Sequence, residues 1–251
     1  MPQMELKICG LAAVRGQFAA DAGAIKRLYF DYDTGRKVGV ISKALAQARK
    51  VYRCVEPAEL EKIAGTVHHG GIVAVIEVPE WRAPPKEEIA DWGRRGEAVV
   101  VLDRIGNAHN LGAIVRTAAF FGVKHIVIAD DAAAAVPGEA AYRVAEGGMS
   151  QVTVWRVKNV GGFLRELVAA GFDVVGAATR GGRPEAKGAG GKRVAIVLGN
   201  EEHGLAEDVA RACTRLVTIP GSGRVESLNV SAAAAVLLWE LVGRAGRKGA
   251  G

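Results

Sequence analysis

Cysteine is scarce in this 251-residue chain, which contains only Cys9, Cys54 and Cys213. Three widely spaced thiols suit neither a disulfide framework nor a zinc site, so we expect a protein of the reducing cytoplasm without a metal ion. Long apolar runs are also absent, since none approaches the ~18 residues that a membrane-spanning helix needs. Charged residues from Glu5 onward interrupt any leader-like stretch. These absences predict a protein that neither crosses a membrane nor is secreted.

The motifs of several common enzyme classes are missing as well. No Walker pattern occurs, and no Gly-x-Gly-x-x-Gly follows a first strand, which argues against a P-loop and an ordinary dinucleotide site. The chain has no nucleophile elbow of the hydrolase type and no helical pair of histidines for a metal. The adjacent His68 and His69 would point to opposite faces of an extended segment, which favours a structural role.

The charge that is present is mainly positive. The formal net charge is +6 and the pI is about 9.3, with Lys and Arg in both halves of the chain. A distributed positive charge favours a polyanionic partner such as nucleic acid. Hydrophobic residues make up 49% of the chain, which is enough for a sizeable core.

The chain divides into two expected domains. Residues 1–78 mix helical and strand patterns, which predicts a small α/β domain. Residues 79–96 hold three prolines, two tryptophans and mixed charges, which is typical of a linker. From residue 97 on, apolar runs alternate with helical patterns, which predicts an α/β domain with a parallel sheet. Its expected strands are 97–103, 125–129, 152–155, 172–178, 194–198 and 216–219, and its expected helices include 110–121, 139–147 and 160–170. Residues 183–192, rich in Gly and Lys, are expected to form a loop.

Two glycine-rich segments follow buried-strand patterns near the end of the chain. One continues the strand 194–198 through Gly199, Glu201 and Gly204, and the other runs from Ile219 through Gly223 to Asn229. Ligands of open α/β sheets bind outside the carboxyl ends of the strands. We therefore expect these loops to build a ligand cleft largely from backbone. In a purely structural interpretation, Glu201 complements a helix dipole and Ser227 or Asn229 caps the last helix.

A third constellation opens the first helix of the second domain. Asn110 is expected to cap this helix, and Arg116 lies one turn after Gly112. Helical side chains lean toward the N-terminus, so Arg116 points back over the glycine. The guanidinium would then stand beside a helix N-terminus, which is a natural anion site. A surface arginine beside a loosely capped helix is the alternative.

Together, these blocks resemble the SpoU (TrmH-type) branch of the SPOUT RNA methyltransferases. The family motif Asn-x-Gly-x-x-x-Arg is matched by Asn110, Gly112 and Arg116, and Gly-x-Glu-x-x-Gly is matched by Gly199, Glu201 and Gly204. The third motif is matched by Ile219, Pro220, Gly223, Ser227, Leu228 and Asn229. The N-terminal segment also resembles the family's substrate-binding domain. Two positions depart from the family pattern: Gly221 stands where Met is usual, and Gly148 where Ala is usual.

The resemblance implies a methyltransferase domain over residues 97–251 with a C-terminal trefoil knot, and an RNA-binding domain over residues 1–78. It implies methyl transfer from S-adenosylmethionine to a ribose 2′-hydroxyl of structured RNA, with ribosomal RNA favoured over tRNA, by a homodimer. The implied catalytic residues are Arg116, Asn110, Glu201, Ser227 and Asn229. The implied cofactor-binding residues are Leu198, Gly199, Ile219, Gly223 and Leu228.

Two other functions stay open at this point. A non-catalytic RNA-binding or assembly protein could keep the same fold, although the intact polar motif residues argue against it. An unrelated α/β enzyme of small-molecule metabolism is the third reading, and the basic pI argues against that one.

Overall fold

The computed structural model describes residues 5–179, 182 and 193–244. Contacts between residues divide the chain into two compact units. Unit 1 comprises residues 1–80 and 137–151, and unit 2 comprises residues 81–136 and 152–251. The loop predicted over 183–192 lies outside the described residues.

Unit 1 is built on a mixed four-stranded sheet in the order β1-β4-β2-β3. Its strands are β1 (Glu5–Cys9), β2 (Ile25–Phe30), β3 (Val51–Cys54) and β4 (Ile72–Glu77). β4 pairs antiparallel with both β1 and β2, and its unbroken apolar run suits this central place. β3 pairs in parallel with β2 at the edge, and all four of its side chains are exposed.

The helices of unit 1 come from two separate stretches of the chain. The first stretch supplies α1 (Leu11–Asp21), α2 (Tyr32–Gly35), α3 (Gly39–Gln47) and α4 (Pro57–Ala64), and the second supplies α7 (Glu139–Ala145). A short 3₁₀ turn over Gly148–Gln151 packs so closely on α1 that a Cβ at Gly16 would lie 2.2 Å from the Ser150 hydroxyl oxygen. The second stretch is thus an integral part of this fold. The sequence had placed it in the other domain.

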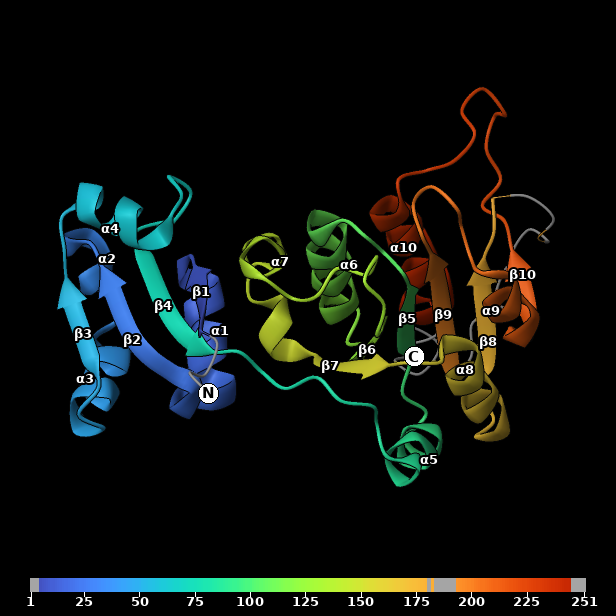
Figure 1. Ribbon diagram of the computed structural model, residues 1–251, viewed down its shortest axis with the longest axis horizontal. Coiled ribbons are helices and arrows are strands. Elements are labelled where there is room, and N and C mark those ends of the chain that lie inside the picture. The colour runs from blue at the N-terminus through green and yellow to red at the C-terminus, as the bar shows by residue number, and fades with distance from the viewer. Residues whose placement is uncertain (1–4, 180–181, 183–192, 245–251) are drawn as a thin grey trace. The chain divides into compact units, whose positions relative to one another are not determined.

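Unit 2 holds a six-stranded parallel sheet in the order β10-β8-β9-β5-β6-β7 (Figure 1). The strands are β5 (Val99–Asp103), β6 (His125–Ala129), β7 (Thr153–Val157), β8 (Asp173–Ala177), β9 (Val194–Gly199) and β10 (Arg215–Val217). All five strand pairings are parallel. The chain runs outward from β5 through β7 and then crosses to β8. The strand order therefore reverses at the β5–β9 pair, the kind of place where α/β sheets bind ligands.

Helices cover both faces of this sheet. They are α5 (Lys86–Arg95), α6 (Ala108–Phe120), α8 (Val160–Ala169), α9 (Glu207–Ala212) and α10 (Val230–Leu238), which a π-helical turn extends over Trp239–Gly243. Alternate strand residues such as Val99, Val101, Val127 and Val197 pack with α5, α8 and α9 in one core. α6 packs on α10, and α10 contacts β9. The strands are apolar on both faces because both faces are buried.

The region predicted as a linker differs from expectation. Residues 86–95 form α5, and Ile89 and Trp92 are buried in the core of unit 2. A Cβ at Gly93 would lie 2.8 Å from the Ala170 carbonyl oxygen, so the glycine lets α5 approach α8 closely. Two buried side chains three residues apart carry the helical signal, and the surrounding charges and prolines obscured it.

The six strands predicted for the second domain are confirmed, each end within two residues of its predicted position. The mixed helical and strand patterns expected over residues 1–78 correspond to the helices α1 to α4 and the strands β1 to β4. Among the residues that the structure describes, no helix is both long and apolar enough to cross a membrane.

Candidate functional site

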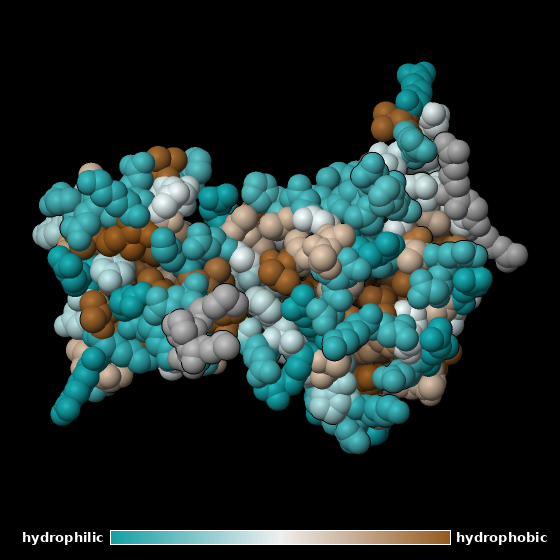
Figure 2. Space-filling view, in the orientation of Figure 1, coloured by the Kyte–Doolittle hydropathy of each residue, from teal (hydrophilic) through white to brown (hydrophobic). Residues whose placement is uncertain are grey.

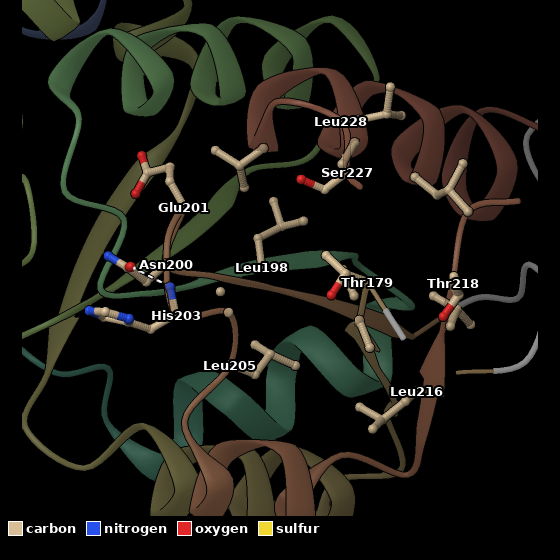
Figure 3. A pocket seen from close by; sticks show the side chains of 18 of the residues that line it. Thr179, Leu198, Asn200, Glu201, His203, Leu205, Leu216, Thr218, Ser227 and Leu228 are labelled. Carbon is tan, nitrogen blue, oxygen red and sulfur yellow. Dashed lines mark hydrogen bonds between the residues drawn. The ribbon is translucent and has the colours of Figure 1, made fainter. Parts of the chain in front are cut away.

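A cavity of about 540 Å³ opens at the carboxyl ends of β8, β9 and β10 (Figure 3). The register pairs Asp103 with Gly199 and Ala177 with Val217, so the strands end at one edge. This volume lies in the usual range for small-molecule sites. Of the predicted site residues, seven line the cavity: Leu198, Gly199, Glu201, Ile219, Ser227, Leu228 and Asn229.

The loop after β9 is folded back on itself. Asn200 and Gly204 exchange two backbone hydrogen bonds, at 3.0 and 2.9 Å, and Gly204 takes a positive φ of 68°. A Cβ at Gly199 would lie 2.3 Å from both Gly204 C and Leu205 N. Only glycine fits there, because the atoms it would strike are backbone. The glycines of this motif therefore shape one wall of the cavity.

Asp103 fastens this loop to the end of β5. Its side chain is 2% exposed, and its Oδ2 accepts a hydrogen bond of 2.8 Å from the backbone N–H of Ala206. Arg104, at a positive φ of 57°, donates to both carboxylate oxygens of Asp103, at 2.9 and 3.2 Å. The Asn200 amide donates to the Arg104 carbonyl at 2.8 Å. Sequence reasoning missed Asp103; its signal was a carboxylate at the end of an otherwise apolar strand.

Glu201 joins the loop after β9 to the loop after β5. Its carboxylate accepts hydrogen bonds from the backbone N–H groups of Gly106 and Asn107, at 3.1 and 3.3 Å, and from Nδ2 of Asn110 at 2.8 Å. Burial raises the pKa of Glu201, but the hydrogen bonds, that of Asn110 first, outweigh it and hold the pKa below its usual range. The carboxylate is therefore held at the start of α6, where it fixes the loop after β9 to the loop after β5.

Asn110 in turn contacts the third segment. Its Oδ1 accepts a hydrogen bond of 3.2 Å from Nδ2 of Asn229, whose own Oδ1 accepts from the backbone N–H of Ser231 at 2.9 Å. Asn229 is thus the cap of α10, and Ser227 lies in the preceding loop. The prediction that Asn110 caps α6 is wrong: Asn107 does so, accepting from the N–H of His109 at 2.8 Å. Because Asn107 supplies the cap, the side chain of Asn110 is available to link the other two segments.

Three predicted site residues do not line the cavity. Asn110 reaches it through Asn229. Arg116 is exposed on α6, six residues and so about 9 Å along the helix from Asn110. Gly223 has a positive φ of 77° within an exposed segment, residues 221–229, that projects between β10 and α10 (Figures 1 and 2). A Cβ at Gly221 would meet no atom within 4 Å, so the glycine is not sterically required there.

The other walls come from residues that the sequence analysis did not select. Thr179 and Thr218 follow β8 and β10, and Leu205 and Leu216 supply apolar surface (Figure 3). Across from them, Ser227 and Leu228 come from the segment before α10. Over the described part of the chain, no group of three or more His, Cys, Asp or Glu side chains could hold a metal ion. The cavity suits an organic ligand with one apolar part and several hydrogen-bonding groups.

Comparison with known proteins places this site in a family. The model of the SpoU rRNA methylase family matches residues 97–239, and the model of the RNA 2′-O ribose methyltransferase substrate-binding domain matches residues 7–82. The 23S rRNA (guanosine-2′-O-)-methyltransferase RlmB of Nitrosomonas europaea is 32% identical, over 93% of this chain and 89% of its own. An uncharacterized tRNA/rRNA methyltransferase, YfiF of Escherichia coli O157:H7, is 35% identical over 94% of this chain, which spans only about two thirds (67%) of YfiF.

A solved structure shares the whole architecture. The AdoMet-bound rRNA methyltransferase of Sinorhizobium meliloti is 27% identical, with a TM-score of 0.75 over 94% of this chain and 86% of its own. The match covers 94% of this chain, so each of the two units has a counterpart in that structure.

Proposed function

The chain belongs to the SpoU rRNA methylase family, and from that premise we propose that it transfers a methyl group from S-adenosylmethionine to a ribose 2′-hydroxyl of ribosomal RNA. The observation that carries the proposal is the hydrogen-bonded chain Glu201–Asn110–Asn229, which joins the three motif segments at one cavity. A cytoplasmic location follows from an rRNA substrate.

The cavity fits the family's cofactor on physical grounds. Gly199 lets the backbone of Gly204 and Leu205 pack against it, so the loop after β9 can present peptide groups to the cavity beside the Leu205 side chain. Leu198, Ile219 and Leu228 would contact the apolar parts of S-adenosylmethionine, and the backbone around Gly199 would bind its polar groups. When bound, the cofactor supplies a methyl group activated by a sulfonium. Gly223 would act by shaping the exposed segment.

The residues around the cavity would position the ribose. Asn110 and Asn229 already hold each other and could share a hydrogen bond with a sugar oxygen, while Ser227 presents a hydroxyl from the same segment. Glu201 keeps Asn110 in place. We assign Arg116 to binding the target phosphate and stabilising the alkoxide that develops on the 2′-oxygen. A guanidinium stays protonated in proteins, so Arg116 is not the base.

A homodimer is the second part of the proposal. Phe120 on α6 is 82% exposed, and Val236 and Trp239 at the end of α10 are also exposed. Ring contacts link Phe120 to Phe121 and Phe121 to Trp239, so the exposed apolar groups form one patch. A contiguous patch of this kind marks a protein–protein interface. A Phe120→Asp variant should therefore elute as a monomer; a wild-type monomer in light-scattering chromatography contradicts the dimer.

The enzymatic proposal is tested by methyl transfer from labelled S-adenosylmethionine to 23S rRNA and, in parallel, to bulk tRNA. The product should resist alkaline cleavage at one nucleotide, because a 2′-O-methyl group removes the attacking hydroxyl. We expect Arg116→Ala to keep the cofactor Kd within about twofold and to lose ~100-fold or more in turnover, the scale of one lost transition-state contact. Arg165→Ala, which removes an exposed arginine on α8, is the matched control.

The outcomes separate the competing functions. Cofactor binding with transfer to tRNA alone would contradict the rRNA assignment. RNA binding without cofactor binding would favour a non-catalytic assembly protein. Unchanged turnover in Arg116→Ala would remove that residue from the proposed chemistry.

A further inference from the structure

The positive charge of the chain is concentrated in one part of unit 1. Residues 25–54 hold eight basic and two acidic side chains, a net charge of +6 that equals the net charge of the whole chain. This segment covers β2, α2, α3 and β3. Lys26, Arg27 and Arg53 of this segment pair with glutamates outside it. The remaining excess of positive charge lies in residues 31–50, which hold five basic and two acidic side chains and can attract an anionic partner.

An exposed aromatic ring lies inside this basic segment. Tyr32, the first residue of α2, is 70% exposed. The guanidinium carbon of Arg36 lies 5.1 Å from the centre of the Tyr32 ring, and Nη2 of Arg36 donates to the Tyr32 hydroxyl at 3.3 Å. A single exposed aromatic residue is ordinary on a protein surface. The ring stays 70% exposed although a cation contacts it, so it has surface left on which a further planar group can stack.

The turn that carries Tyr32 is fixed to the body of unit 1. Asp31 accepts a hydrogen bond of 2.8 Å from the N–H of Thr34, and its own N–H donates to the Gly71 carbonyl at 3.0 Å. A Cβ at Gly71 would lie 2.4 Å from Oγ1 of Thr34 and 2.6 Å from Oδ2 of Asp31. Gly71 also has a positive φ of 77°. The backbone under the ring is therefore ordered before any ligand binds, which lowers the entropy cost of stacking.

Two more cations lie near Arg36 in the fold. Arg15 of α1 donates to the carbonyl of Lys37 at 2.8 Å, which places its guanidinium beside the residue that follows Arg36. The side chains of Arg15, Arg36 and Lys37 are exposed. Arg15, Arg36 and Lys37 outnumber the two acids of the turn, Asp31 and Asp33, so the net charge of this group is positive. Phosphate groups on either side of a stacked base would find these cations within reach.

We propose that Tyr32 and Arg36 form a stacking platform for an unpaired base of the RNA substrate, with Arg15 and Lys37 on the flanking phosphates. The inference depends on the proposed function for its ligand class. Proteins read RNA sequence mainly in loops and bulges, where bases can stack on aromatic rings and guanidinium planes. Unit 1 would therefore select an rRNA segment with a splayed base, in addition to attracting the backbone.

The test measures RNA binding by the full-length protein, independently of methyl transfer. The probes are a fluorescein-labelled RNA hairpin with an unpaired loop and a fully paired duplex of the same length. Tyr32→Ala should weaken hairpin binding about 5- to 100-fold, the scale of one lost base–aromatic stack. Tyr32→Phe should bind like the wild type, and duplex affinity should be unchanged. Tyr52→Ala, which removes an exposed tyrosine of β3 in the same basic segment, is the matched control.

Arg36→Ala reports the electrostatic half of the platform. The variant should bind both probes more weakly, and the slope of log affinity against log salt concentration should fall by about one. Equal hairpin affinity in Tyr32→Ala and wild type overturns the platform, and so does an equal loss for hairpin and duplex. Cofactor affinity measured on the same variants should not change. A wild type that binds the hairpin through Tyr32 but methylates no RNA would contradict the proposed function and leave the platform supported.

Discussion

The two edges of the six-stranded sheet in unit 2 both carry polar groups, but they connect the chain differently. At the carboxyl edge, Glu201 and Asn110 lie 91 residues apart in sequence, and Asn110 and Asn229 lie 119 apart. At the amino edge, the partners are neighbours on adjacent elements. His125 bonds Glu97, 28 residues away, at 2.8 Å, and Lys124 bonds the same carboxylate at 2.9 Å.

The amino edge is also packed as a core rather than opened as a cavity. The Trp92 ring stacks on His125 with centroids 4.1 Å apart and planes at 22°, and its Nε1 donates to Glu88 at 2.9 Å. Trp92 is fully buried. At the carboxyl edge, polar groups join distant segments of the chain around a cavity, and together they form a site. At the amino edge, similar groups join neighbouring segments beneath an aromatic ring, and together they form part of the packed core.

Gly199→Ala, at the carboxyl edge, is expected to have the largest effect on the site. The new methyl group would strike the backbone of Gly204 and Leu205, and overpacking of this kind costs about 1–3 kcal/mol. Since ~1.4 kcal/mol is a factor of ten in affinity, we expect S-adenosylmethionine to bind roughly 10- to 100-fold more weakly by calorimetry. The control is Gly221→Ala, where a Cβ meets open space. Equal cofactor affinities in the two variants would contradict the proposal that Gly199 shapes the wall of the cofactor cavity.

Glu201→Gln tests the link between the loops. The N–H groups of Gly106 and Asn107 bond to different carboxylate oxygens, so the NH2 group of a glutamine would face at least one of these donors, and an unsatisfied donor costs about 1–3 kcal/mol. Denaturant unfolding should show this loss, and methyl transfer should fall with it. Because the pKa of Glu201 is lowered in the folded state, its stabilisation is present above the ordinary pKa of 4.5 and disappears only as the pH falls below that value. Glu202→Gln, with a side chain 85% exposed, should change neither quantity.

Trp92→Phe probes the amino edge. The variant loses the hydrogen bond to Glu88 and part of the buried ring, which should cost about 1–2 kcal/mol of unfolding free energy. Cofactor affinity of the folded variant should stay at the wild-type value. A weakened cofactor Kd with normal stability would mean that the two edges are coupled, contrary to the comparison.

The smallest expected effect is a pH dependence from His125. Burial lowers the pKa of this imidazole, and the hydrogen bond to Glu97 only partly offsets that effect. The unfolded chain therefore binds the proton more readily, so stability is complete above the ordinary pKa of 6.5 and declines as the pH falls below it. His125→Gln should reduce the change in unfolding free energy between pH 7 and 5.5. An unchanged slope would show that other groups set it.

Much of unit 2 could be predicted because its signals are local. Apolar runs such as 194–198 and the motif spacing around Glu201 identify the strands and the loops that follow them. The structure joins Asn110 to Glu201 and Asn229, but its predicted role as the cap of α6 is wrong, since capping by Asn107 depends on backbone geometry that sequence does not display. α5 and the transfer of residues 137–151 to unit 1 were missed, because both depend on which distant surface buries a few apolar side chains. The trefoil knot stays a prediction.

The convergence of the loop after β9, the end of β10 and the segment before α10 on one cofactor cavity is tested most directly by hydrogen–deuterium exchange with and without S-adenosylhomocysteine. The account predicts added protection in residues 198–205, 216–219 and 226–230, and none in residues 92–97 or 124–125 at the opposite edge. Saturating ligand that protects the amino edge, or only one of the three segments, would contradict it.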